Sequence, residues 1–177
     1  MTSLYQDIRA RHLAQVQELR LAAPVDLDAA RRWAEAVREG YYYFYAQRKI
    51  KIGLENIDWN GGQFAHKEWP CLLNRFGPMV QVHDTGEGDD LPGLARRLIA
   101  DWIAQHAYGA DKPLAPGDNA LNLSIRLGQL GPFCGLWPAV VGFDRPDVFD
   151  EEFLQTMLAS TRGQAAALQV NLCSGGK

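Results

Sequence analysis

The sequence predicts a single all-α domain of about six or seven helices. Most of the chain consists of segments in which apolar residues recur with helical spacing, separated by short stretches rich in Asp, Pro and Gly. A chain of 177 residues with 47% hydrophobic content can bury a sizeable core, and no internal repeat or low-complexity segment divides it. We therefore expect residues 1–177 to form one helical domain.

The first two predicted helices occupy residues 3–21 and 27–45. The first carries apolar residues near one face and is followed by Pro24. Asp26 or Asp28 is expected to cap the second, LDAARRWAEAVREGYYYFY. Its buried candidates are Trp33, Val37 and the aromatic run from Tyr41 to Tyr45, although Gly40 leaves the position of its end open.

Residues 47–63, QRKIKIGLENIDWNGGQ, follow a different pattern. Ile50 and Ile52 alternate with Lys49 and Lys51, which is the period of a short strand or an extended segment. Gly61 and Gly62 mark a turn at its end. A loop of this length inside a helical domain is a place to look for function.

The stretch AHKEWPCLLNRFG, residues 65–77, begins the third predicted helix. Asn74 lies opposite its apolar face, with Arg75 at the flank, and Pro78 is expected to kink or break the helix before Asp84 and Gly86. The apolar face comprises Trp69, Leu72, Leu73, Phe76, Met79 and Val80.

Four further helices are expected. One runs LPGLARRLIADWIAQHAYG from Asp89 or Asp90, and DNALNLSIRLGQL begins at Asp118. A short helix is expected inside GPFCGLWPAVVGF, and a last one from near Asp147 through Leu168. Within DNALNLSIRLGQL the polar residues share an arc of about 80°: they are Asn119, Asn122, Arg126 and Gln129.

Two interpretations of these polar stripes remain open. Asn74 and Arg75 on one helix, and Asn122 and Arg126 on another, are explained by ordinary solvent-exposed faces. Alternatively, they form a polar cleft, because amides and guanidinium groups recognise hydroxyl and carboxylate groups. Trp59 and Trp69 would then offer a stacking surface beside it, whereas tryptophan is more commonly a core residue.

Composition excludes several classes of function. The net charge of −3 is too acidic for a typical nucleic-acid binder, and no apolar run approaches the length of a membrane span. The three cysteines and four histidines show no metal-ligand spacing, so we expect no metal and no cofactor. No nucleophile or phosphate-binding motif is present. The N-terminus has no signal peptide, which indicates either a cytoplasmic protein or a true start upstream.

Three segments taken together resemble a known family. HKEWPCLLNRF, then LIADWIAQH, then NLSIRLGQL, with IDWNGGQ just before them, look like the helical N-terminal domain of heparinase II/III-type polysaccharide lyases. The resemblance covers roughly Ile50 to the C-terminus. Its weight lies in the order and spacing of the pieces.

The resemblance implies an incomplete (α/α) toroid followed by a β-sandwich domain. It implies an exported, usually periplasmic enzyme that cleaves heparan sulfate-like or alginate-like polysaccharide by β-elimination. That chemistry requires a group that neutralises the uronate carboxylate, a His or Tyr base and a Tyr acid. On this interpretation Asn74, Arg75, Asn122, Arg126, Trp59 and Trp69 bind an acidic polysaccharide.

The chain departs from the family at two places. Phe76 stands where His often follows the Asn-Arg pair, and the chain ends CSGGK near where the neutralising Asn is expected, so no catalytic residue is assigned. We therefore expect the substrate-binding front part of a lyase, cut short and inactive alone, with an uncovered apolar face that favours self-association. The alternative is a non-catalytic helical module that binds carbohydrate or protein. A glycoside hydrolase fragment would need a carboxylate pair that is not evident.

Overall fold

The computed structural model describes residues 4–22, 26–45, 47–77, 82, 85, 88–109, 114, 118–128 and 135–173. Helices account for 61% of the described residues. In chain order the elements are α1 (Leu4–Ala22), α2 (Leu27–Arg38), β1 (Tyr41–Phe44), β2 (Arg48–Lys51), α3 (Trp69–Leu73), α5 (Asp90–Gln105), α6 (Ala120–Arg126), α7 (Leu136–Val141) and α8 (Glu151–Cys173).

The prediction of an all-α incomplete (α/α) toroid is wrong. The structure is mostly helical but contains a two-stranded antiparallel sheet, and its helices do not form a clear toroid. The predicted second helix was to continue to Tyr45, whereas α2 ends at Arg38. Gly40, with φ of 72°, turns the chain out of the helix, and the aromatic run that follows prefers a pleated strand.

The hairpin gives its two faces different surroundings. Tyr42 pairs with Ile50 and both side chains are buried, whereas Lys49 and Lys51 on the alternate positions are exposed. This confirms the predicted alternation of Ile and Lys in residues 49–52. The strand β1, which pairs with β2, was not predicted.

The remaining helices follow the predicted segments with shifted ends. Asp26 caps α2, its Oδ1 accepting a hydrogen bond from the Ala29 backbone N–H at 3.0 Å. Asn119 caps α6 in the same way through the N–H of Asn122. Helix α3 is much shorter than predicted and ends at Leu73; Pro78, Met79, Val80, Gln81, Asp84 and Gly86, like Gln129, lie outside the described residues.

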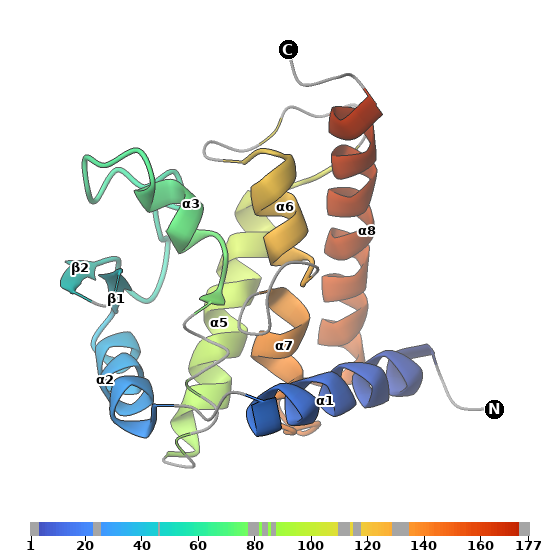
Figure 1. Ribbon diagram of the computed structural model, residues 1–177, viewed down its shortest axis with the longest axis horizontal. Coiled ribbons are helices and arrows are strands. Elements are labelled where there is room, and N and C mark those ends of the chain that lie inside the picture. Colours follow the sequence, from blue (N-terminus) through green and yellow to red (C-terminus); the bar gives the residue numbers. More distant parts are fainter. Residues whose placement is uncertain are drawn as a thin grey trace.

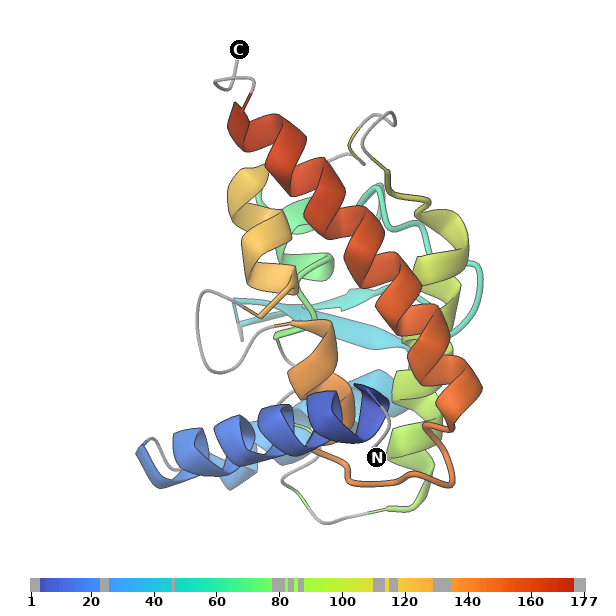
Figure 2. The same cartoon turned by 90° about the vertical axis from the view of Figure 1, so that its right-hand side faces the viewer.

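Helix α5 occupies the middle of the fold (Figure 1). On one side of it lie α2, the hairpin and α3, and on the other α7 and α8. Helix α1 crosses beneath α7, and α8 runs diagonally past α6 and α7 (Figure 2). The main core lies along α5 and contains five buried tryptophans beside its aliphatic residues: Trp33, Trp59, Trp69, Trp102 and Trp137.

Helices α6 and α8 enclose a smaller apolar cluster of Leu123, Ala167 and Leu168. Asn122 and Arg126 lie on α6 together with Leu123 of this cluster. Among the helices described, none has the length and apolar character needed to cross a membrane.

Candidate functional site

Trp59 and Trp69 are core residues in this structure. Trp59 is 3% exposed and Trp69 is fully buried. Each indole N–H has a partner: Trp59 Nε1 donates to Asp101 Oδ2 at 2.8 Å, and Trp69 Nε1 donates to Gln63 Oε1 at 3.1 Å. Because neither ring presents an open face, the structure shows no stacking platform at these positions.

Asn74 is also buried, and its amide joins three segments of the chain. Its Nδ2 donates to the backbone oxygens of Trp59 and Pro70, at 2.9 and 2.7 Å. Its Oδ1 accepts a hydrogen bond from Trp102 Nε1 at 2.6 Å. The side chain is only 3% exposed, which excludes the solvent-exposed interpretation and assigns the amide a bridging role between the 57–61 loop, α3 and α5.

Arg126 lies at the centre of a buried polar network. Its Nη2 forms an ion pair with Asp118 at 2.7 Å, and the two side chains are 0% and 2% exposed. Its Nε donates to Gln164 Oε1 at 2.9 Å and its Nη1 to the Asn74 backbone oxygen at 3.1 Å. Such a buried charge is tolerated only because the opposite charge and further acceptors surround it.

Aromatic rings complete the surroundings of Arg126. The guanidinium carbon lies 4.6 Å from the Trp102 ring centroid and 5.5 Å from that of Tyr108. The Tyr108 hydroxyl donates to Asp118, and burial raises the pKa of that hydroxyl far above its ordinary value. Sequence reasoning missed Asp118, Tyr108 and Gln164; only Asp118 carried a signal, as the expected start of its helix.

A histidine and a tyrosine, the side chains that β-elimination requires, lie side by side here. The ring centroids of His106 and Tyr108 are 6.2 Å apart, and His106 stacks on Trp102 at 4.7 Å. Burial lowers the pKa of His106, which favours its neutral form. Tyr108, however, has its proton held by Asp118 and a raised pKa, so it is a poor base and we assign no catalytic role to the pair.

Arg75 differs from the other candidates because it is half-buried and has no carboxylate partner among the described residues. Its Nε and Nη2 both donate to Asn122 Oδ1, at 2.9 and 2.6 Å. In the described part of the chain no carboxylate lies within ion-pair distance of its guanidinium group. Asn122 itself is 1% exposed, so its amide holds the guanidinium group from the buried side. The Arg75 side chain is half-buried and therefore also reaches solvent.

The backbone around Arg75 is held from both sides. The Gly135 N–H donates to the Arg75 carbonyl oxygen at 3.2 Å. Phe76 adopts φ of 56°, an uncommon conformation for a bulky residue. Its ring is buried against those of Trp59 and Trp102, with ring centroids 5.7 and 5.6 Å away. The sharp turn after α3 therefore sets the direction in which Arg75 leaves the chain.

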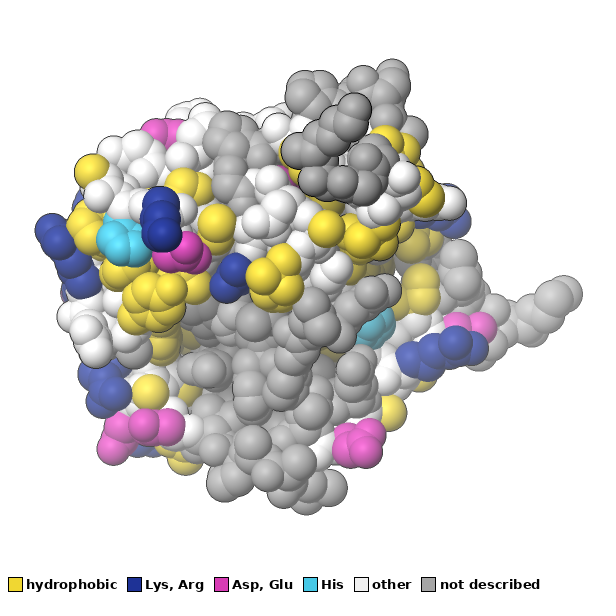
Figure 3. Space-filling view, turned by 45° about the horizontal axis from the view of Figure 1, so that its top comes forward, with side chains coloured by type: hydrophobic (Ala, Val, Ile, Leu, Met, Phe, Trp, Pro, Cys, Tyr) yellow, Lys and Arg dark blue, Asp and Glu magenta, His cyan; other side chains and the backbone are white. Residues whose placement is uncertain are grey.

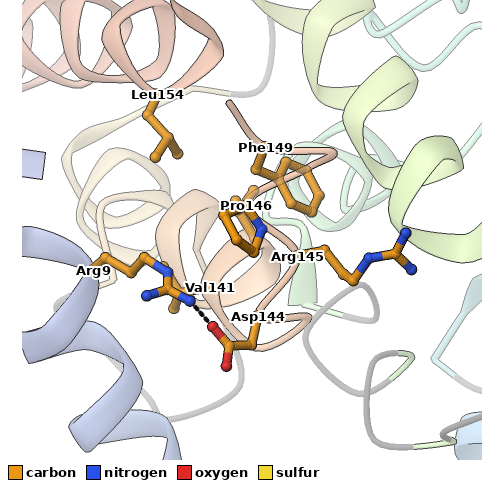
Figure 4. Close-up of a pocket in the computed structure, with 8 residues that line it drawn as sticks. Arg9, Val141, Asp144, Arg145, Pro146, Phe149 and Leu154 are labelled. Atoms are coloured by element: carbon orange, nitrogen blue, oxygen red, sulfur yellow. Dashed lines mark ion pairs between the residues drawn. The ribbon is translucent and has the colours of Figure 1, made fainter. Parts of the chain in front are cut away.

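A small pocket between α1, α7 and α8 is separate from this cluster (Figure 4). Arg9 reaches into it and forms an ion pair with Asp144, while Arg145 pairs with Asp147 at 2.7 Å. Its remaining lining is mostly apolar, including Phe149 and Leu154. Because both of its guanidinium groups are already paired with carboxylates, this pocket is a weaker anion site than Arg75.

Within the described ranges, no group of three or more His, Cys, Asp or Glu side chains is placed to hold a metal ion. No family model, curated protein or solved structure matches this chain. The candidate site therefore rests on the geometry of the chain alone. It consists of Arg75 at the surface, supported by the buried polar network around Asn74 and Arg126.

Proposed function

We propose that this chain is the substrate-binding N-terminal portion of a heparinase II/III-like polysaccharide lyase. When complete, such an enzyme would cleave a uronic-acid-containing polysaccharide, heparan sulfate-like or alginate-like, by β-elimination. The chain alone binds the acidic polysaccharide and does not cleave it. The proposal rests on the resembling segments and on Arg75, and not on the overall architecture, which differs from the expected toroid.

The observation that carries the proposal is the state of Arg75. A guanidinium group with no carboxylate partner in the described part of the chain, held by Asn122 and reaching solvent, suits a carboxylate or sulfate of an acidic sugar. Its planar fork binds such groups through two parallel hydrogen bonds. Arg126, by contrast, already has Asp118 as its counter-ion and is fully buried.

A second observation supports treating the resembling segments as one unit. Asn74, Trp102 and Arg126 come from three separate segments that carry the resemblance, and they contact one another directly. In this proposal Asn122 positions Arg75, while Asn74 and Arg126 hold the helices in place without touching the sugar. Trp59 and Trp69 belong to the same framework.

The test is a titration of fluorescein-labelled heparan sulfate and alginate oligosaccharides, read by fluorescence anisotropy. Arg75→Gln should weaken binding about tenfold, the value of one charge-assisted contact. Its urea unfolding midpoint is measured in parallel, because the substitution also removes two donors to the buried Asn122 Oδ1. The affinity of Arg75→Lys should lie between those of wild type and Arg75→Gln, because lysine keeps the charge but lacks the planar guanidinium fork. Arg162→Gln, an exposed change on α8, is the matched control.

Two results would contradict the proposal. If the wild-type chain binds neither oligosaccharide, or if Arg75→Gln binds as tightly as wild type, Arg75 is not the recognition group. Formation of unsaturated uronate by the purified chain would contradict the expectation that it is inactive alone.

A non-catalytic protein-interaction module is the second candidate, and a specific observation favours it. Leu121 on α6 and Val170 and Leu172 on α8 are 52%, 44% and 65% exposed, and the two helices pack together. Exposed apolar side chains of this size mark contact surfaces when they adjoin. Sedimentation velocity of wild type and of Leu172→Gln distinguishes the cases: self-association that the substitution abolishes supports a contact surface.

A further inference from the structure

The exposed face of the hairpin holds its cations in fixed positions. Strand pairing places Tyr41 opposite Lys51 and Tyr43 opposite Lys49. The ammonium groups of Lys49 and Lys51 each lie 4.5 Å from the centroid of the Tyr41 ring. Cation–π contact of this kind restrains two long side chains that would otherwise be free to move.

Arg48 of β2 and Lys67 of the neighbouring 63–67 segment add two more cations. The guanidinium carbon of Arg48 lies 4.3 Å from the centroid of the Phe64 ring, and Phe64 stacks on His66 at 5.9 Å. Lys67 follows and is exposed. Among the described residues, neither Arg48 nor Lys67 has a carboxylate partner. We call Arg48, Lys49, Lys51, Phe64, His66 and Lys67 the hairpin patch.

The hairpin patch gathers four Lys and Arg side chains although the whole chain carries a net charge of −3. Glu39 is the carboxylate that pairs with it, accepting a hydrogen bond from Lys49 Nζ at 2.6 Å, which lowers the pKa of Glu39. Glu68 follows Lys67 and forms no ion pair with the patch cations among the residues described. Figure 3 shows Lys and Arg side chains gathered on the side of the molecule where Figure 1 places the hairpin and α3.

The patch and Arg75 flank the same short helix. Trp69, the first residue of α3, contacts Phe44 of β1, with ring centroids 6.2 Å apart. Arg75 follows the other end of α3, which spans about 8 Å at 1.5 Å per residue. Two positive sites therefore lie at opposite ends of one helix.

We propose that the hairpin patch is a second binding surface for the acidic polysaccharide, taking carboxylate or sulfate groups further along the chain that Arg75 contacts. This inference rests on the proposed function. A polysaccharide suits the patch better than a nucleic acid, because Arg48 and His66 already cover the Phe64 ring and two ammonium groups contact Tyr41. These rings restrain cations and leave little surface on which a base can stack.

The experiment compares two doubly substituted chains of equal net charge. Arg48→Gln with Lys67→Gln removes the two patch cations that have no carboxylate partner among the described residues. Arg11→Gln with Arg162→Gln removes two exposed cations on α1 and α8 as the matched control. Each chain, and Arg75→Gln, is titrated with a labelled heparan sulfate oligosaccharide and with a labelled oligothymidine at several salt concentrations.

The patch variant should bind heparan sulfate about tenfold more weakly, the sum of two exposed charge contacts. Its log Kd should also depend less steeply on log salt, because fewer counterions are released. The control chain should change less than about twofold. Oligothymidine should bind more weakly than the sugar at the same ionic strength.

Each contrary result has its own meaning. Equal weakening in patch and control chains, or no weakening in the patch chain, overturns the inference. Tighter binding of oligothymidine than of heparan sulfate overturns the choice of partner. If the patch variant loses binding and Arg75→Gln does not, the patch stands and the proposed role of Arg75 fails; if wild type binds no sugar, both fail.

Discussion

Arg126 donates a hydrogen bond from Nη1 to the backbone oxygen of Asn74 at 3.1 Å, although the two residues are 52 positions apart in the chain. The same Asn74 accepts a hydrogen bond from Trp102 on α5, whose ring lies under the Arg126 guanidinium. One buried network thus ties α3, α5 and α6 together. The network includes Asn74, the residue immediately before Arg75.

Breaking the Arg126–Asp118 ion pair should destabilise the fold severely. Arg126→Met leaves the Asp118 carboxylate buried without its counter-ion, which should lower the free energy of unfolding by about 3–5 kcal/mol. Urea denaturation followed by tryptophan fluorescence measures this change. The double variant Arg126→Met with Asp118→Leu should recover part of the loss, because no unpaired charge then remains buried. Equal losses in the single and double variants would argue against the pair.

The amide of Asn74 should also contribute measurably to stability. Asn74→Ala removes the acceptor of the Trp102 indole N–H and the donor to two backbone oxygens. Leaving these buried groups unsatisfied should cost about 2–3 kcal/mol. Asn60→Ala, at an exposed position in the neighbouring loop, is the control and should change stability by less than about 0.5 kcal/mol. An unchanged urea midpoint for Asn74→Ala would show that the network is not stabilising.

The start of α7 depends on a glycine that no other residue replaces easily. Gly135 has φ of 114°, and a Cβ there would lie 3.0 Å from backbone atoms of Arg126 and Gly128. Gly135→Ala should therefore lower the free energy of unfolding by about 2 kcal/mol or more. Gly93→Ala is the matched control: it lies within α5, with open space around the added carbon, and should stabilise by about 0.5–1 kcal/mol. Opposite signs for the two substitutions are the expected result.

Local patterns predicted most of the helices and one strand, because those depend on residues close together in the chain. The Ile and Lys alternation of residues 49–52 indicated β2. Asp26 or Asp28 was expected to cap α2, and the structure shows that it is Asp26. The run from Tyr41 to Phe44 fits a helix face and a strand equally well. Pairing with β2 makes this run a strand. The spacing of apolar residues within the run does not indicate that pairing.

The burial of the polar candidates could not be predicted in the same way. An arginine on a helix face is ordinarily exposed, since burying its charge is costly without a partner. Arg126 is buried because Asp118, Gln164 and the Asn74 carbonyl converge on it from different elements. Arg75 is half-buried and so lies closer to the solvent-exposed position that its helix pattern predicts. Its role in binding is a prediction.

Stability should fall as the pH drops from about 7 to 5, through two half-buried histidines. Burial lowers the pKa of both His12 and His106 from the ordinary value of 6.5, so the folded protein favours their neutral forms. Between the folded and the unfolded pKa the unfolded chain binds more protons, so stability rises with pH there. The contribution is complete above about pH 6.5 and is lost as the pH falls through the folded values.

The surroundings of the two histidines explain the effect and provide the test. His12 stacks on Trp137 at 5.9 Å, and its buried Nδ1 has no hydrogen-bond partner among the described residues. His106 stacks on Trp102 at 4.7 Å and lies beside Tyr108. Urea unfolding at pH 7.5, 6 and 5 should show less dependence on pH in His12→Gln and in His106→Gln than in wild type. The carboxylates with lowered pKa, such as Asp90 and Asp147, act at lower pH because their ordinary value is 3.8. Equal slopes in all three chains between pH 7.5 and 5 would exclude the histidines as the cause.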